Sequence, residues 1–134
     1  MLNILIVDDD FSTRKLLNRI LQRKAVVDHA VSGREALEAF SLSVSQCDPY
    51  DAILLDITMP DMDGNLVLNE IRSQEKNRGI TMGKGVPIIM VTGRKDMMMQ
   101  SFGDGCDDYL IKPFSPTILM DKIRKLVAGR QEPA

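Results

Sequence analysis

The chain has 134 residues, of which 44% are hydrophobic and 27% are charged, and its formal net charge is −2. This composition is that of one ordinary globular domain, and the longest apolar runs fall far short of the ~20 residues that a bilayer span requires, which excludes a disordered chain and a membrane protein. An acidic balance repels nucleic acid, so we expect no direct DNA binding. We expect a cytoplasmic location, because the apolar runs are short and no basic segment of a signal peptide precedes them.

Five short apolar segments alternate with amphipathic segments along the chain. The expected strands are residues 3–7, 26–30, 52–55, 87–91 and 109–111. The first, third and fourth are nearly continuous in Ile, Leu and Val, which is typical of a parallel sheet with helices on both faces. The sequence therefore predicts an α/β fold built on a doubly wound sheet.

Apolar residues at helical spacing fill the segments between these strands. They are Leu16, Leu17, Ile20 and Leu21, then Leu37, Phe40 and Val44, then Val67, Leu68 and Ile71. Such stripes predict amphipathic helices. Ser32 with Glu35 three residues later fits a capping box. Residues 77–86 contain three glycines and are expected to form a long loop.

The last expected helix starts with Ser115 as its N-cap and Pro116 at its first position. It should run to about Ala128, because Gly129 favours a helix end. We therefore assign residues 1–128 to the folded domain and residues 129–134 to a flexible C-terminal tail.

Polar side chains follow the expected strands. They are Asp8, Asp9 and Asp10 after the first, Asp56 after the third, Thr92 after the fourth and Lys112 after the fifth. The carboxyl ends of parallel strands meet at one edge of the sheet, and open α/β sheets bind ligands outside this edge. We expect these side chains to form one site.

Three carboxylates in this site, those of Asp8, Asp9 and Asp56, would repel one another. Two unit charges ~4 Å apart cost on the order of 4 kcal/mol at an effective dielectric of about 20, so the cluster calls for a cation. Oxygen ligands without histidine or cysteine favour a hard ion, and Mg²⁺ is the one that commonly meets phosphate oxygens. The predicted cofactor is Mg²⁺.

A carboxylate beside Mg²⁺ can attack a phosphoryl group and form an aspartyl phosphate. We assign this role to Asp56, because it ends a buried strand and the chain turns away directly after it. Charge that develops on the phosphoryl oxygens needs donors nearby. Lys112 supplies a cation and Thr92 a hydroxyl.

Four segments carry a resemblance to a known family. They are Asp8-Asp9, residues 54–64 (LLDITMPDMDG), residues 91–93 (VTG) and residues 107–114 (DDYLIKPF). In this order they closely resemble the response-regulator receiver domains of two-component phosphorelays, such as the stand-alone chemotaxis-type receivers. The resemblance implies a flavodoxin-like sheet of five parallel strands in the order 2-1-3-4-5, with helices on both faces.

The resemblance implies a phosphoacceptor role for Asp56. The donor would be the phosphohistidine of a sensor histidine kinase or of a histidine phosphotransfer protein. Mg²⁺ would be held by Asp8, Asp9, Asp56 and the backbone carbonyl of Thr58. The chain would be a signalling domain rather than an enzyme, with Mg²⁺-dependent self-phosphorylation and slow autodephosphorylation.

The resemblance also implies a switch pair, Thr92 and Tyr109. In the family the hydroxyl moves toward the phosphate and the ring turns inward, which changes the face of the fourth strand, fourth helix and fifth strand that binds a downstream protein. Lys112 would anchor the phosphate, and its bond to Pro113 is expected to be cis. We expect a stand-alone receiver without a DNA-binding output domain, because no linker to a second domain follows.

The chain departs from the family pattern at several positions. Gly93 stands where alanine is common, and Asp10 adds a third acid to the usual pair. Residues 97–99 are three methionines in the expected fourth helix, at 94–103, which favours either an adaptable partner surface or a contribution to the core. Thr58 and Arg94 border the phosphate in family members and would tune the phosphoryl lifetime.

Two other classes of function share some of these features. A Mg²⁺-dependent phosphohydrolase with an aspartate nucleophile would use the same acids, but Thr58 stands where such enzymes place a general acid. A binding module that works without phosphorylation is the other alternative. A flavin phosphate would be repelled by Asp8 to Asp10, and a calcium loop over residues 59–70 would begin with Met59 instead of an acid.

Overall fold

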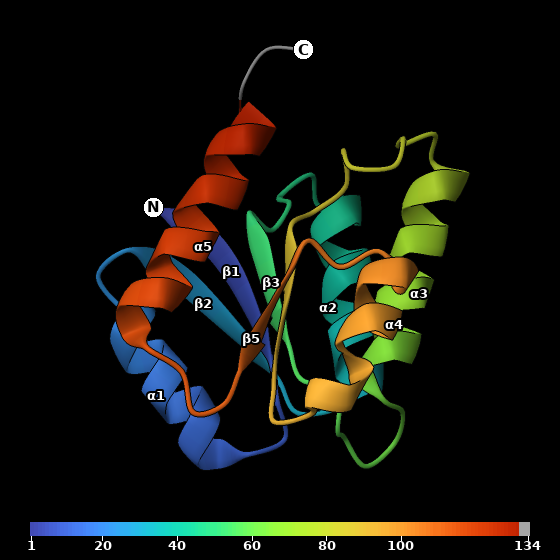
Figure 1. The fold of residues 1–134 in the computed structure, drawn as a ribbon. Coiled ribbons are helices and arrows are strands. Elements are labelled where there is room, and N and C mark those ends of the chain that lie inside the picture. The colour runs from blue at the N-terminus through green and yellow to red at the C-terminus, as the bar shows by residue number, and fades with distance from the viewer. Residues whose placement is uncertain (132–134) are drawn as a thin grey trace.

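A sheet of parallel strands forms the centre of the computed structural model, which describes residues 1–131 (Figure 1). Within these residues the strands are β1 (Leu2–Val7), β2 (Ala25–Ala30), β3 (Ala52–Leu55), β4 (Ile88–Thr92) and β5 (Asp108–Ile111). Their order is β2-β1-β3-β4-β5, and every neighbouring pair is parallel. The predicted flavodoxin-like, doubly wound sheet is confirmed.

Helices cover both faces of this sheet (Figure 1). They are α1 (Phe11–Leu21), α2 (Gly33–Ser45), α3 (Gly64–Asn77), α4 (Met98–Asp104) and α5 (Pro116–Gln131), with a short 3₁₀ helix, η1 (Lys95–Met97), before α4. The helices α1 and α5 pack on one face, and α2, α3 and α4 lie on the other. No helix within residues 1–131 is both long enough and apolar enough to cross a membrane.

The strands owe their continuous apolar character to burial on both faces. Successive side chains of a strand point to opposite sides. In β1, Ile4 and Ile6 therefore join the core under α1 and α5, while Leu5 and Val7 join the core under α2 and α3. Each fully buried Ile or Leu contributes about 1.5–3 kcal/mol, so this double core fixes where the strand ends point.

Helix ends follow the predicted caps with two differences. Ser32 Oγ accepts the backbone N–H of Glu35, but the Glu35 carboxylate accepts the N–H of Val31 instead of closing a capping box on Ser32. The predicted end of α5 near Ala128 was wrong, because α5 runs through Gly129 to Gln131. One glycine costs a helix only about 1 kcal/mol, which packing of the same helix can outweigh. Residues 132–134 of the expected tail lie outside the described residues.

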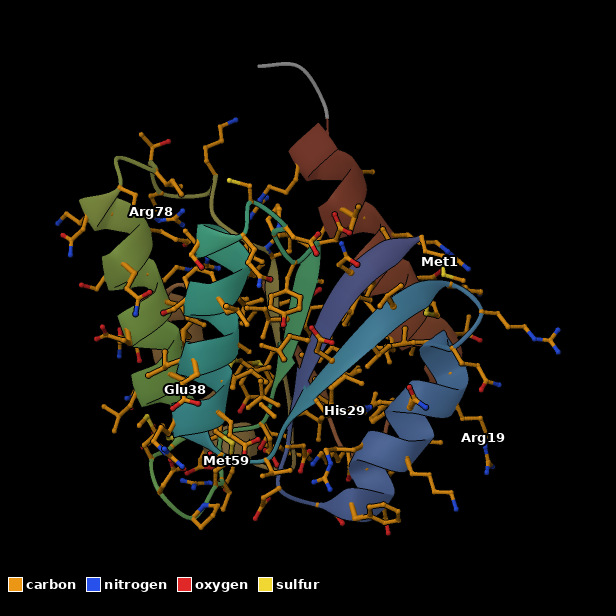
Figure 2. The ribbon with its side chains drawn as sticks, turned by 180° about the vertical axis from the view of Figure 1, so that it is seen from behind. Met1, Arg19, His29, Glu38, Met59 and Arg78 are labelled. Carbon is orange, nitrogen blue, oxygen red and sulfur yellow. The ribbon has the colours of Figure 1, made fainter. Side chains whose placement is uncertain are left out.

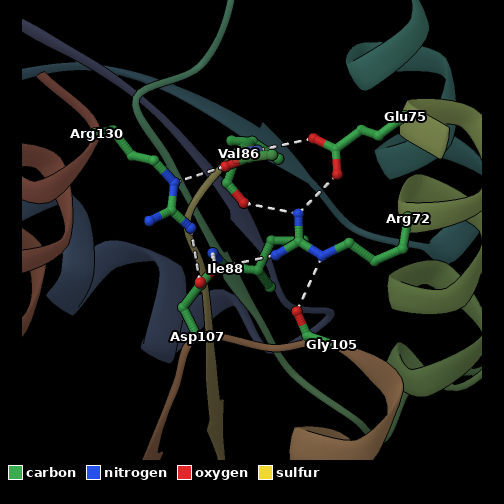
Figure 3. Close-up of polar contacts among 8 residues, drawn as sticks. Arg72, Glu75, Val86, Ile88, Gly105, Asp107 and Arg130 are labelled. Atoms are coloured by element: carbon green, nitrogen blue, oxygen red, sulfur yellow. Dashed lines mark hydrogen bonds and ion pairs between the residues drawn. The ribbon is translucent and has the colours of Figure 1, made fainter. Parts of the chain in front are cut away.

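A polar network joins the amino-terminal ends of β4 and β5 to α3 and α5 (Figure 3). The Arg72 guanidinium donates to the carbonyls of Gly105 (2.9 Å) and Val86 (2.8 Å), and to the carboxylates of Glu75 (2.8 Å) and Asp107 (3.0 Å). Arg130 donates to Asp107 (2.7 Å) and to the carbonyl of Gly85 (2.8 Å). These bonds anchor the long 78–87 connection at the end of the sheet opposite to the carboxyl edge.

Candidate functional site

Two acids of the expected site come from neighbouring strands. Val7 pairs with Leu55 in the register of β1 and β3, so Asp8 and Asp56 leave the sheet side by side. The side chains of Asp8 and Asp56 are nearly buried, with residue exposures of 2% and 8%, while Asp9 is exposed. One oxygen from each of the three carboxylates lies within 4.8 Å of the others. Among the described residues, no other group of acids, histidines or cysteines gathers in this way.

Lys112 bridges the two buried acids from the end of β5. Its Nζ lies 2.7 Å from Asp8 Oδ2 and 3.1 Å from Asp56 Oδ2. Its backbone N–H bonds to the carbonyl of Thr92, which sets β5 beside β4, and its peptide bond to Pro113 is cis as the resemblance implied. Three carboxylates against one ammonium leave an excess of two negative charges, which suits a divalent cation.

Burial shapes the charge states at this edge. Burial raises the pKa of Asp8, an effect that the bonds from Lys112 and from the Asp10 N–H only partly offset. Burial also opposes the charge on Lys112, but the bonds and charges of Asp8 and Asp56 together outweigh it, so the pKa of Lys112 is raised. Lys112 therefore stays a fixed cation beside the acids at neutral pH.

Asp10, the additional acid, does not join the cluster. It is the N-cap of α1, where its carboxylate accepts the backbone N–H of Ser12 (3.1 Å) and the hydroxyl of Thr13 (2.9 Å). These two bonds, that of Thr13 foremost, lower the pKa of Asp10. Asp10 thus stabilises the start of a helix rather than holding a ligand.

The expected switch residues sit on adjacent strands. Thr92 is the last residue of β4, not the first beyond it, and its buried hydroxyl accepts the backbone N–H of Arg94 at 3.3 Å. Tyr109 on β5 is buried, its hydroxyl donates to the carbonyl of Arg94, and burial raises its pKa. The Arg94 guanidinium pairs with Asp96, so it is engaged outside the acidic cluster.

The three methionines of residues 97–99 divide between the two readings. Met97 is partly buried against the core, whereas Met99 is 86% exposed on α4. Met98 and Phe102 on the same helix are also exposed. The core interpretation is therefore confirmed for Met97, while a partner surface formed by the exposed methionines stays a prediction.

The loop after β3 contains residues whose roles the sequence did not reveal. Thr58 is exposed between buried Ile57 and Met59. Figure 2 shows Met59 at the end of the sheet where His29 lies near the carboxyl end of β2. Asp61 accepts two backbone N–H groups of α2, and Asp63 is the N-cap of α3. Both acids are therefore occupied as backbone acceptors, which argues against the calcium-loop reading.

Gly64 begins α3 where the helix meets the backbone of the acidic site. A Cβ at this position would overlap the carbonyl oxygen of Asp56 and lie 2.9 Å from Ile57 Cα. We expect Gly64→Ala to lower the free energy of unfolding by about 1–3 kcal/mol, measured by urea unfolding, because rigid backbone must move. The control is Gly129→Ala, since a Cβ there meets nothing within 4 Å and should stabilise α5. Equal stabilities of the two variants would contradict the steric account.

Comparisons with known proteins agree with this geometry. The family model described as response regulator receiver domain matches residues 4–124. The transcriptional regulatory protein SrrA of Staphylococcus aureus is 35% identical over 130 residues, which are 96% of this chain and 48% of SrrA, so the chain spans about half the length of this curated relative.

Two solved structures have closely similar folds. The signal receiver domain of a signal transduction histidine kinase from Syntrophus aciditrophicus is 28% identical with a TM-score of 0.82, and the match covers 100% of this chain and 96% of that one. A CheY-like response regulator receiver domain protein from Methanospirillum hungatei is 29% identical with a TM-score of 0.80, over 98% of this chain and 97% of that one. The strand order, the acidic edge and the family match together show that the chain belongs to the response regulator receiver domain family.

Proposed function

We propose that Asp56 is the phosphoacceptor of this receiver domain. A carboxylate oxygen of Asp56 attacks phosphorus while the bond from phosphorus to a histidine nitrogen of the donor breaks, and the electron pair of that bond returns to the nitrogen. The product is an acyl phosphate on Asp56. The observation that carries the proposal is the contact of Lys112 Nζ with both Asp8 and Asp56 at the carboxyl edge of the sheet.

The donor set at this edge fits Mg²⁺. Asp8, Asp9 and Asp56 would hold the ion, with the backbone carbonyl of Thr58 as a further ligand. All of these are oxygens, and they carry an excess of negative charge. When bound, Mg²⁺ neutralises charge on the oxygens of a phosphoryl group during transfer. Lys112 provides a second, fixed cation beside the acceptor.

The proposed signal passes through Thr92 and Tyr109. The Thr92 hydroxyl ends β4 at the acidic edge, where it can donate to a phosphoryl oxygen in place of accepting from Arg94. Such a move would disturb the Arg94 backbone, whose carbonyl binds the Tyr109 hydroxyl. Tyr109 lies beside the partly exposed ring of Phe102 on α4, with ring centroids 6.4 Å apart. The face formed by β4, α4 and β5 is therefore the proposed surface for a downstream protein.

Receiver domains interact with histidine kinases or phosphotransfer proteins and with downstream effectors. The absence of direct DNA binding, the cytoplasmic location and the stand-alone state remain predictions. The phosphohydrolase alternative gains no support, because Thr58 lacks an acidic group that could protonate a leaving group.

Intact-mass spectrometry after incubation with acetyl phosphate tests the proposed reaction. We expect the chain to gain one phosphoryl group in the presence of Mg²⁺ and none when EDTA removes the ion, because the acids then repel the incoming phosphate. Peptide mapping should place the group on the segment that contains Asp56. Labelling that is unaffected by EDTA would refute the metal-assisted mechanism, and no labelling of a folded chain would favour the phosphorylation-independent binding module.

A further inference from the structure

The loop between β3 and α3, residues 57–63, is tied to a helix from a different part of the chain. Both carboxylate oxygens of Asp61 accept backbone N–H groups of α2, from Gly33 at 2.9 Å and from Arg34 at 3.0 Å. In the first turn of a helix these N–H groups have no partner inside the helix, and the helix dipole favours a negative charge there. The bonds from Gly33 and Arg34 also lower the pKa of Asp61, so its carboxylate is charged at neutral pH.

The loop also packs closely against the start of α2. A Cβ on Gly33 would overlap the side chain of Met62, so the absence of a side chain at Gly33 allows the approach. On the other side of the loop, Ile57 and Met59 are buried in the core that includes α2 and α3. Thr58 is the exposed residue between the buried side chains of Ile57 and Met59.

Three sets of hydrogen bonds hold the loop in place. The Gly64 N–H bonds to the carbonyl of Ile57 at 2.7 Å, which closes the loop on itself. Asp63 caps α3 through the N–H of Leu66 at 2.9 Å, a bond within three residues. Of the three sets, the Asp61 bonds are the one that joins the loop to a separate element, 28 and 27 residues away in sequence.

We propose that Asp61 is a positioning residue for the divalent cation: its two bonds to α2 fix the loop that offers the Thr58 carbonyl to the metal. The inference rests on the proposed function, and it assigns Asp61 no contact with the ion, because both of its oxygens are already engaged. Mg²⁺ demands near-ideal octahedral geometry, so a loop that can drift presents its carbonyl less effectively. Residues that orient metal ligands commonly change metal affinity by about 10–100-fold.

The test is a titration of Mg²⁺ followed by backbone amide chemical shifts. We expect Asp61→Ala to weaken Mg²⁺ binding by about tenfold, the low end of the range for residues that orient ligands. Asp61→Asn keeps one oxygen acceptor and should be intermediate. In both variants the amide signals of Gly33 and Arg34 should shift before any metal is added, because they lose a charged acceptor.

Asp63→Asn is the matched control. It removes one negative charge from the same loop, but asparagine caps a helix about as well as aspartate, so the loop stays in place. We expect its Mg²⁺ affinity to lie within about twofold of the original chain, since exposed charges are well screened. Both variants lose one negative charge. A difference in Mg²⁺ affinity between the Asp61 and Asp63 variants therefore measures the effect of the hydrogen bonds to α2 and not the effect of the charge.

Equal affinities of the Asp61→Ala and Asp63→Asn variants would overturn the inference. If the Asp61→Ala variant does not fold, the Mg²⁺ affinity of Asp61→Asn is compared with that of Asp63→Asn instead. Equal affinities of these two variants would overturn the inference as well. An original chain that binds no Mg²⁺ gives a different result, since it would overturn the proposed metal site and this inference together.

Discussion

Asp56→Asn should abolish phosphorylation by acetyl phosphate while leaving the fold intact. Asparagine matches aspartate in shape but lacks the anionic oxygen that attacks phosphorus, so we expect the labelling rate to fall at least about a hundredfold. Lys112 keeps its 2.7 Å contact with Asp8, which still joins the carboxyl end of β5 to that of β1 across the acidic edge. The charge of Asp56 contributes to the raised pKa of Asp8, so its removal relieves repulsion. The thermal midpoint should therefore be unchanged or higher.

The control for this prediction is Asp10→Asn. Asp10 lies two residues after Asp8, yet its carboxylate caps α1 and is not part of the acidic cluster. Asparagine is an equally good N-cap, so this variant should be phosphorylated at the original rate. Both proteins are measured by intact mass over time under identical Mg²⁺ and donor concentrations. Persistent labelling of Asp56→Asn would mean that another carboxylate is the acceptor, and loss of labelling in Asp10→Asn would mean that this cap belongs to the site.

The fold could be predicted from the sequence because its strands are buried on both faces. In β1, β3 and β4 this burial requires runs of Ile, Leu and Val, and such runs identify strands without any knowledge of their partners. Element ends were less predictable. Thr92 was predicted to follow β4, but it is part of β4 and pairs with Ile111 of β5. The sequence alone does not show which residues at the end of a strand will pair with a neighbouring strand.

The site was predictable where its residues share one geometric cause. Asp8, Asp56 and Lys112 each follow a parallel strand, and this alone brings them to one edge. Asp10 was grouped with them by position, although an aspartate directly before a helix is also an N-cap signal. Asp61 left no comparable signal, because its partners on α2 belong to a different segment and the bonds are made to backbone atoms that any sequence would supply.

Arg72→Met should destabilise the chain more than any surface substitution. The Arg72 guanidinium makes four hydrogen bonds, and its partner Glu75 has a side chain that is only 5% exposed. Removing the cation leaves the Glu75 carboxylate charged and without its ion-pair partner in a poorly solvated place. We therefore expect a loss of about 3–5 kcal/mol in the free energy of unfolding. This is a large share of the roughly 5–15 kcal/mol that holds a typical domain together. Because the chain has no tryptophan, urea unfolding is best followed by far-UV circular dichroism.

Two further variants separate the causes of this loss. Adding Glu75→Gln to Arg72→Met removes the unpaired negative charge, while the amide oxygen of glutamine can still accept the N–H of Val86. Part of the lost stability should therefore return. Arg34→Met removes an arginine whose pair with Glu38 is long, at 3.5 Å, and well exposed, so it should cost under about 1 kcal/mol. A loss below about 1 kcal/mol for Arg72→Met would contradict this account, because it would show that the network contributes no more than an exposed surface ion pair.

Arg72→Met also tests whether the stability of the fold and the rate of phosphorylation depend on different parts of the structure. The Arg72 network lies at the amino-terminal ends of β4 and β5 (Figure 3). Asp56 and Lys112 lie at the opposite, carboxyl edge of the sheet. Well below its unfolding midpoint, Arg72→Met should therefore be phosphorylated at close to the original rate. A labelling rate that falls with stability at low temperature would instead indicate that the sheet transmits strain from one edge to the other, because closely packed cores resist local distortion.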